Sequence, residues 1–95
     1  MPKSDVAKEI TDLIGISEVR FSTGSTEPKE LWTGIVEALG LGVDTSLPKQ
    51  KIARAIVESC GELWLPDYES TGGTVTFQGM VAVKRAVQFY LNNKT

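Results

Sequence analysis

Apolar residues recur at helical spacing in four separate stretches of the chain. They predict helices over residues 4–14, from Pro28 to Leu39, over about 48–60, and over about 79–91. Gly15 and Gly40 follow the first two stretches as C-terminal stops, and Pro28 suits the first turn of the second. These stripes, with one β-branched residue between the last two helices, predict a single core: Leu31, Trp32, Ile35, Ile52, Ile56, Val75, Val83 and Val87.

Two short runs between the third and fourth helices have the pattern of strands. Leu63-Trp64-Leu65 and the β-branched run Thr74-Val75-Thr76-Phe77 flank a polar turn region, Pro66–Gly73. They predict a β-hairpin, and a weaker alternation over residues 17–22 predicts one further short strand. The expected fold is α+β and mainly α, with four helices and a short hairpin, in one domain that spans residues 1–95.

The order of these elements resembles that of a winged helix-turn-helix domain, in which the hairpin would be the wing. A second resemblance is carried by Tyr68–Thr76, followed by Gly79 and an apolar helix. This stretch is similar to the end of small modules attached to bacterial restriction endonucleases or related defence proteins. Both resemblances imply DNA binding, and the second implies a setting in restriction–modification.

Composition sets limits on these expectations. At 95 residues, with 41% hydrophobic and 23% charged residues, the chain has the make-up of one ordinary globular domain. A net charge of −2 argues against a protein coated in positive charge, although a local basic face remains possible. The single cysteine, the amphipathic N-terminus and the absence of a run near 20 apolar residues together predict a cytoplasmic protein without a membrane segment.

Several catalytic chemistries are excluded by the residues that the chain lacks. Without histidine there is no Ser-His-Asp or Cys-His arrangement, and Cys60 alone cannot form a zinc site. No phosphate-binding loop or dinucleotide-binding fingerprint is present. We therefore expect no enzyme, no metal and no cofactor, and Cys60 is expected to be a small residue of the core.

Pro66-Asp67 opens like the signature of a metal-dependent nuclease. That signature also needs an acidic residue two positions before a lysine, but Ala82 stands two positions before Lys84. Asp67 and Glu69 offer at most a weak divalent-ion site, and an exposed loop tip is the favoured interpretation.

The third predicted helix carries the most informative surface. Lys49, Gln50, Lys51 and Arg54 lie outside its apolar stripe and near its N-terminus. In a helix-turn-helix this part of the second helix enters the major groove, where Gln50 would read adenine and Arg54 guanine. The lysines would neutralise phosphates. The alternative is a solvated helix face with ordinary charges.

Two further pairs complete the predicted DNA-binding residues: Ser70 and Thr71 in the wing, and Lys84 and Arg85 in the last helix. The expected partner is double-stranded DNA, bound by this chain as an accessory domain or as a homodimer. The acidic hairpin and the near-neutral charge favour the alternative, a protein–protein interaction module or a structural accessory domain of a larger protein. Clustering of Lys49, Lys51, Arg54, Lys84 and Arg85 on one face would favour DNA. An exposed apolar patch around Trp64, Tyr68 or Phe89 would favour a protein partner.

Overall fold

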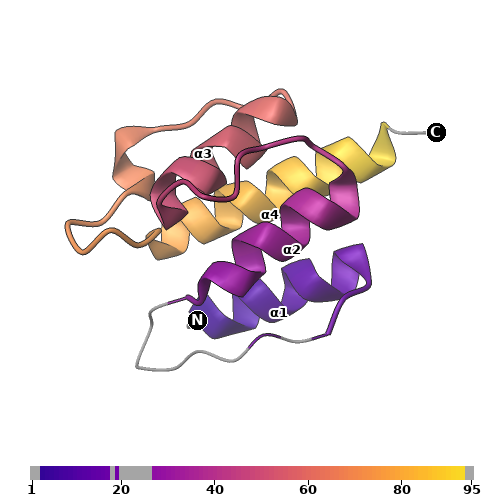
Figure 1. The fold of residues 1–95 in the computed structure, drawn as a ribbon, viewed down its shortest axis with the longest axis horizontal. Helices are drawn as coiled ribbons and strands as arrows, with labels where there is room; N and C mark the ends of the chain where they lie inside the picture. The colour runs from indigo at the N-terminus through magenta and orange to yellow at the C-terminus, as the bar shows by residue number, and fades with distance from the viewer. Residues whose placement is uncertain (1–2, 18, 20–26, 94–95) are drawn as a thin grey trace.

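The four predicted helices are all present in the computed structural model, which describes residues 3–17, 19 and 27–93 (Figure 1). Their bounds lie within two residues of those expected. In chain order the elements are α1 (Lys3–Ile14), α2 (Lys29–Leu39), α3 (Lys49–Ser59), the short 3₁₀ helix η1 (Pro66–Tyr68) and α4 (Phe77–Asn92).

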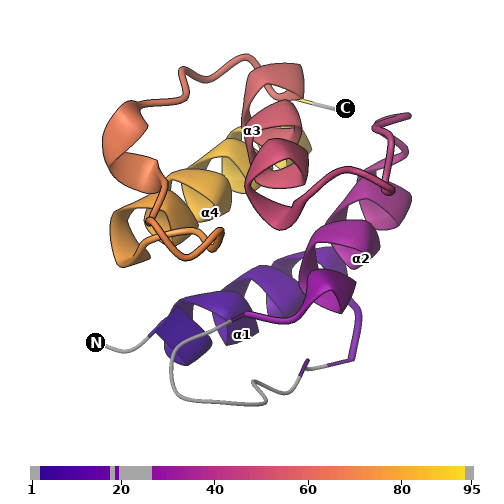
Figure 2. The ribbon, with the colours of Figure 1, turned by 60° about the vertical axis from the view of Figure 1, so that its left-hand side comes forward.

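The helices form two layers. α1 and α2 make one layer and α3 and α4 the other, so that each helix packs against two helical neighbours (Figure 2). Residues 61–68 run beside α3 and α4 on the side away from α1, and η1 packs against α4. No helix in the described part of the chain is both long and apolar enough to cross a bilayer.

The predicted β-hairpin is wrong, and the fold is all-α. Residues 3–17, 19 and 27–93 contain no strand, and the only sheet-like pairing among them is an isolated antiparallel bridge between Glu69 and Val75. The β-branched run fails as a strand because Thr76 caps α4: its hydroxyl accepts the Gly79 N–H at 3.2 Å, and Phe77 already begins the helix. Residues 63–77 therefore do not form a wing.

The weak strand expected over residues 17–22 falls mostly outside the described residues. Ser17 and Val19, which are described, lie in neither a helix nor a strand.

The predicted core is confirmed. All eight residues named from the sequence are fully buried, and α1 adds Val6 and Ile10 to them. Cys60 is buried, as expected. Trp64 packs into the same core, with its ring edge-on to that of Tyr68 at a centroid distance of 5.2 Å.

A buried polar cluster around Glu27 joins three distant parts of the chain. The Lys3 ammonium at the start of α1 donates to the Glu27 carboxylate at 3.0 Å and to the Val75 carbonyl at 2.6 Å. The Val75 N–H donates to the other carboxylate oxygen at 2.8 Å, and the Lys49 ammonium at the start of α3 donates to the Glu27 carbonyl at 2.7 Å. The fully buried Glu27 carboxylate thus receives two donors, the Lys3 ammonium and the Val75 N–H, and one of them carries the opposite charge, as burial of such a group requires.

Candidate functional site

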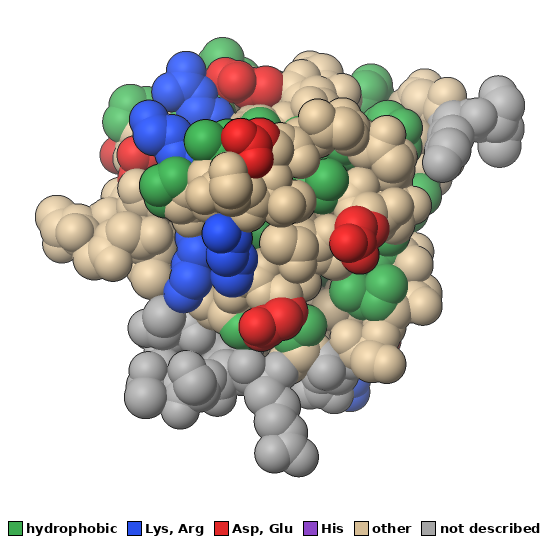
Figure 3. All heavy atoms as spheres, viewed as in Figure 1, with side chains coloured by type: hydrophobic (Ala, Val, Ile, Leu, Met, Phe, Trp, Pro, Cys, Tyr) green, Lys and Arg blue, Asp and Glu red, His purple; other side chains and the backbone are tan. Residues whose placement is uncertain are grey.

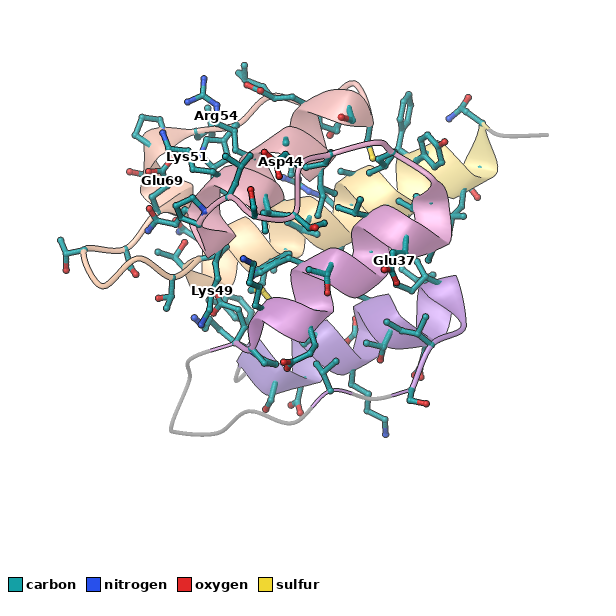
Figure 4. The ribbon with its side chains drawn as sticks, in the orientation of Figure 1. Glu37, Asp44, Lys49, Lys51, Arg54 and Glu69 are labelled. Atoms are coloured by element: carbon teal, nitrogen blue, oxygen red, sulfur yellow. The ribbon has the colours of Figure 1, made fainter. Side chains whose placement is uncertain are left out.

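Three of the four residues of the third predicted helix that were expected to contact DNA lie on one face of the molecule. Lys49, Lys51 and Arg54 point outward from the first half of α3 (Figure 4). Together with Gln50 they are called the α3 face below. Figure 3 shows two groups of Lys and Arg side chains on the left of this view, with acidic side chains beside them and farther to the right.

Most polar groups of the α3 face have partners within the chain. The Lys49 ammonium is held by the Glu27 carbonyl. The Gln50 amide donates to the Ser70 carbonyl at 2.6 Å and to the Thr74 carbonyl at 2.8 Å. Because both of its amide hydrogens are used in this way, Gln50 anchors the 70–74 loop to α3 and is not available to read a base.

Arg54 and Lys51 remain the outward-facing cations of this helix. Arg54 is exposed and forms a salt bridge with Glu58, one turn later, at 3.2 Å. Such an exposed pair is weak, with a median contribution of about 0–1 kcal/mol, and does not prevent another contact. Glu69 lies across from Lys51 and Arg54, and these three residues with Gln50 line a depression of about 20 Å³. The α3 face thus has mixed charge.

The N-terminus of α3 lacks a side-chain cap. Pro48 occupies the N-cap position, and no side chain accepts from the first turn. Ser46 instead donates through its N–H and its hydroxyl to the Asp44 carboxylate, at 2.9 and 2.7 Å. These hydrogen bonds, together with the charge of Lys29, lower the pKa of Asp44. The first turn of α3 contains no acidic residue.

The residues that carry the resemblance to restriction-associated modules hold the segment between η1 and α4 in place. The Thr76 N–H donates to the Tyr68 carbonyl at 2.9 Å, and its hydroxyl donates to the Asp67 carbonyl at 2.8 Å. The Ser70 hydroxyl lies within hydrogen-bond distance of the Thr74 hydroxyl and carbonyl, at 2.7 and 3.0 Å. Thr71 is exposed at the tip of the loop. The hydrogen bonds within residues 67–76 thus give these residues a structural role in the fold.

Gly79 belongs to the same arrangement. A Cβ at this position would lie 2.4 Å from a methyl group of Val75 and 2.8 Å from the Tyr68 carbonyl oxygen. Only a glycine lets the first turn of α4 approach the preceding loop this closely.

Lys84 and Arg85 are directed to different neighbours. Lys84 forms a salt bridge with Glu9 of α1. Arg85 is exposed and lines a hollow between η1 and α4. The five cations whose clustering would favour DNA binding therefore do not share one face, because Lys84 is bound to α1 and Arg85 faces η1. They are Lys49, Lys51, Arg54, Lys84 and Arg85.

That hollow between η1 and α4 has a volume of about 440 Å³. Its apolar lining comes from Leu65 and Tyr68 on one side and from Phe77 and Val81 of α4 on the other. Asp67 and Arg85 also line it. No ion pair joins these two charged residues, nor does either pair with another residue in the described part of the chain.

Exposed apolar residues are concentrated in the two segments that form this hollow, residues 61–68 and α4. Among the described residues, five large hydrophobic side chains are exposed, and four lie in residues 61–65 or on the outer side of α4: Leu63 (75%), Phe89 (49%), Leu65 (39%) and Phe77 (38%). Phe89 lies beside Gly61, at the end of α4 opposite η1. We call the hollow with Leu63 and Phe89 the η1–α4 surface.

Sequence reasoning did not identify the η1–α4 surface as a site, although two signals were available. Phe77, Val81, Arg85 and Phe89 recur every four residues, offset from the core stripe of α4. Leu63 and Leu65 flank buried Trp64, and both are exposed. Of the three residues that the sequence named for an apolar patch, Phe89 is exposed, whereas Trp64 and Tyr68 are buried and Leu63 and Leu65 beside Trp64 are exposed instead.

The described residues offer neither a metal-binding cluster nor an activated thiol. They contain no group of three or more His, Cys, Asp or Glu side chains that could hold a metal ion. Glu69, one of the two carboxylates considered for a divalent ion, accepts the Trp64 indole N–H at 2.7 Å. Burial, with a smaller effect from the charge of Glu62, raises the pKa of the Cys60 thiol. A raised pKa makes the reactive thiolate scarce at neutral pH.

The geometry thus presents two candidate surfaces, a polar one of mixed charge on α3 and an apolar one between η1 and α4. Comparisons with protein-family models, with curated proteins and with solved structures found no match to this chain.

Proposed function

We propose that this chain is a protein-interaction module and that the η1–α4 surface is its contact surface. The observation that carries the proposal is that four of the five exposed large hydrophobic side chains of the described residues lie on residues 61–65 and α4, where two of them, Leu65 and Phe77, line the hollow. Single exposed hydrophobic residues are ordinary, as Leu13 on α1 is here, but a contiguous patch with a polar rim is typical of a protein-binding surface.

The composition of this surface supports the proposal. Phe77 and Phe89 are rigid side chains of large area, and such side chains dominate the free energy of binding in many interfaces. Asp67 and Arg85 give the hollow a polar rim, which sets the orientation of a bound partner. The framework behind the surface is fixed, because Tyr68 and Val81 pack against the core.

A peptide-display selection tests the proposal. The folded wild-type protein serves as the bait, and folded Val81→Asp, which places a charge in the hollow, serves for counter-selection. We expect enriched peptides to be apolar and to bind the wild type with a dissociation constant of about 1–100 μM, as measured by fluorescence titration. Val81→Asp should weaken that binding at least tenfold.

Leu13→Asp is the matched control, since it replaces an exposed hydrophobic residue outside the surface. It should leave peptide affinity within about twofold of wild type. Failure to enrich any peptide, or an equal loss of affinity in both variants, would contradict the proposal.

Nucleic-acid binding by the α3 face is the second candidate function. The specific observation in its favour is that Lys51 and Arg54 are exposed next to a helix N-terminus with neither a side-chain cap nor an acidic residue in its first turn. Backbone N–H groups at such an end attract phosphate. Asp44, Glu58 and Glu69 nearby oppose it, which is why this function comes second.

A duplex titration with a long random sequence at two salt concentrations tests the second candidate. The informative variant is Lys51→Ala/Arg54→Ala, because Lys49 and Gln50 hold the fold and their loss would imitate lost binding. Each lost phosphate contact should flatten the log–log salt dependence by about one unit. No binding by the wild type at low salt, or equal binding by the folded double variant, would exclude this function.

A further inference from the structure

We infer that the occupant of the η1–α4 surface is a second copy of this chain, related to the first by a two-fold rotation. This inference rests on the proposed function and names its partner. Its starting point is that Asp67 and Arg85 line one hollow, carry opposite charges, and have no ion-pair partner in the described part of the chain.

The two charges lie at different heights along α4. The Thr76 hydroxyl donates to the Asp67 carbonyl at 2.8 Å, which fixes the backbone of Asp67 beside the N-cap of α4. Arg85 lies nine residues after Thr76, or about 13 Å along the axis at 1.5 Å per residue. Val81 lies about midway between the two charges and is part of the apolar lining.

This spacing suits an antiparallel pair of α4 helices. In a two-fold dimer the same surface is used twice, so each group must complement the group that faces it. With the axis near Val81, Asp67 of one copy faces Arg85 of the other, and this pair occurs twice. A parallel arrangement would bring the two Arg85 side chains together and would be repelled.

The apolar residues supply the centre of the same interface. Leu65, Phe77 and Val81 from each copy would be covered together, with the charge pairs at either end. The hollow carries one acidic and one basic residue, so it does not repel a second copy through net charge. Because the surface is small, we expect a weak dimer with a dissociation constant of about 10–100 μM.

Sedimentation velocity over about 5–500 μM protein in low salt tests the inference, since salt screens such charge pairs. The wild type should shift from its monomer mass of 10.3 kDa towards twice that value as concentration rises. Asp67→Arg and Arg85→Asp, made singly, should each raise the dissociation constant at least tenfold, by placing like charges opposite each other. The double variant Asp67→Arg/Arg85→Asp should return to within about threefold of wild type, because the swapped charges again complement each other.

Matched charge reversals on α1, Asp12→Arg and Lys8→Asp, change the same charges on exposed residues away from the surface and should leave the dissociation constant unchanged. A thermal melt establishes that each variant is folded. A wild type that stays monomeric over the whole concentration range overturns the dimer. The proposed function is then tested separately by the peptide titration. Dimerisation without restoration in the double variant, or without any effect of the single ones, also overturns this inference.

Discussion

The Glu27 carboxylate accepts the backbone N–H of Val75 at 2.8 Å, across 48 residues of sequence. The same carboxylate receives the Lys3 ammonium, so the start of α1 and the loop before α4 are joined by one buried acidic group. This contact fixes the loop against the helical layers and places Thr76 where it caps α4. The position of the η1–α4 surface therefore depends on a residue far from it.

Removing the charge of Glu27 should destabilise the fold. Glu27→Gln keeps the shape and an acceptor oxygen but leaves the mostly buried Lys3 ammonium without its counter-charge, at an expected cost of about 3 kcal/mol. Urea unfolding measures this loss. Combining the change with Lys3→Met should cost less than the sum of the two single changes, and strict additivity would show that the pair is not coupled. Glu37→Gln, on the exposed side of α2, is the control.

Gly79→Ala should destabilise the protein although it lies within a helix. An alanine in place of a helical glycine usually adds about 1 kcal/mol of stability. Here the new Cβ would meet Val75 and the Tyr68 carbonyl at 2.4 and 2.8 Å, so we expect a net loss of about 1–3 kcal/mol. Gly72→Ala, where a Cβ would meet nothing, should leave the melting temperature unchanged or slightly raised. A stabilised Gly79→Ala variant would contradict the close approach.

Gln50 is expected to act on the loop and not on a ligand. Gln50→Leu removes the two hydrogen bonds to the Ser70 and Thr74 carbonyls and should cost about 1–2 kcal/mol in urea unfolding. Hydrogen exchange should quicken at the Ser70 amide, which is bound within the same loop. Lys51→Leu, a change at the exposed residue next to Gln50, should change neither the stability in urea nor the exchange of the Ser70 amide. Equal effects in the two variants would refute the anchoring role.

Cys60 should be inert in the native protein. Because it is buried and its pKa is raised, its reaction with an aromatic disulfide reagent near pH 8 should be at least about 100-fold slower than in urea. Rapid native labelling would show that the end of α3 opens readily.

The raised pKa of Cys60 also sets the sign of a pH effect. The native thiol keeps its proton to a higher pH than the unfolded one, so the unfolded state releases more protons as the pH rises. Its contribution to stability is therefore complete below about pH 8.5, the pKa of an unfolded cysteine, and declines above it. The difference in stability between the wild type and Cys60→Ala should narrow in alkaline solution, and a widening difference would contradict this sign.

Local pattern determined the helices and the core. The 3.6-residue period identifies a buried stripe without reference to the rest of the chain, so Ile52, Ile56, Val83 and Val87 were correctly placed inside. The same reasoning identified Lys51 and Arg54 as outward-facing residues of α3. These features depend on neighbours within a turn or two, which the sequence displays directly.

Tertiary structure decided the rest, because the deciding contacts join residues far apart in sequence. Thr74–Phe77 has the composition of a strand, but a strand needs a partner along its length. Glu27 and Lys3 instead bind the N–H and the carbonyl of Val75, and Phe77 already begins α4. Gln50 has the position of a base-reading residue, but the loop carbonyls 20 and 24 residues later occupy its amide. The η1–α4 surface forms only when residues 61–68 lie along α4, because its two walls come from these separate segments. The sequence pattern of either segment alone indicates only a few exposed apolar residues.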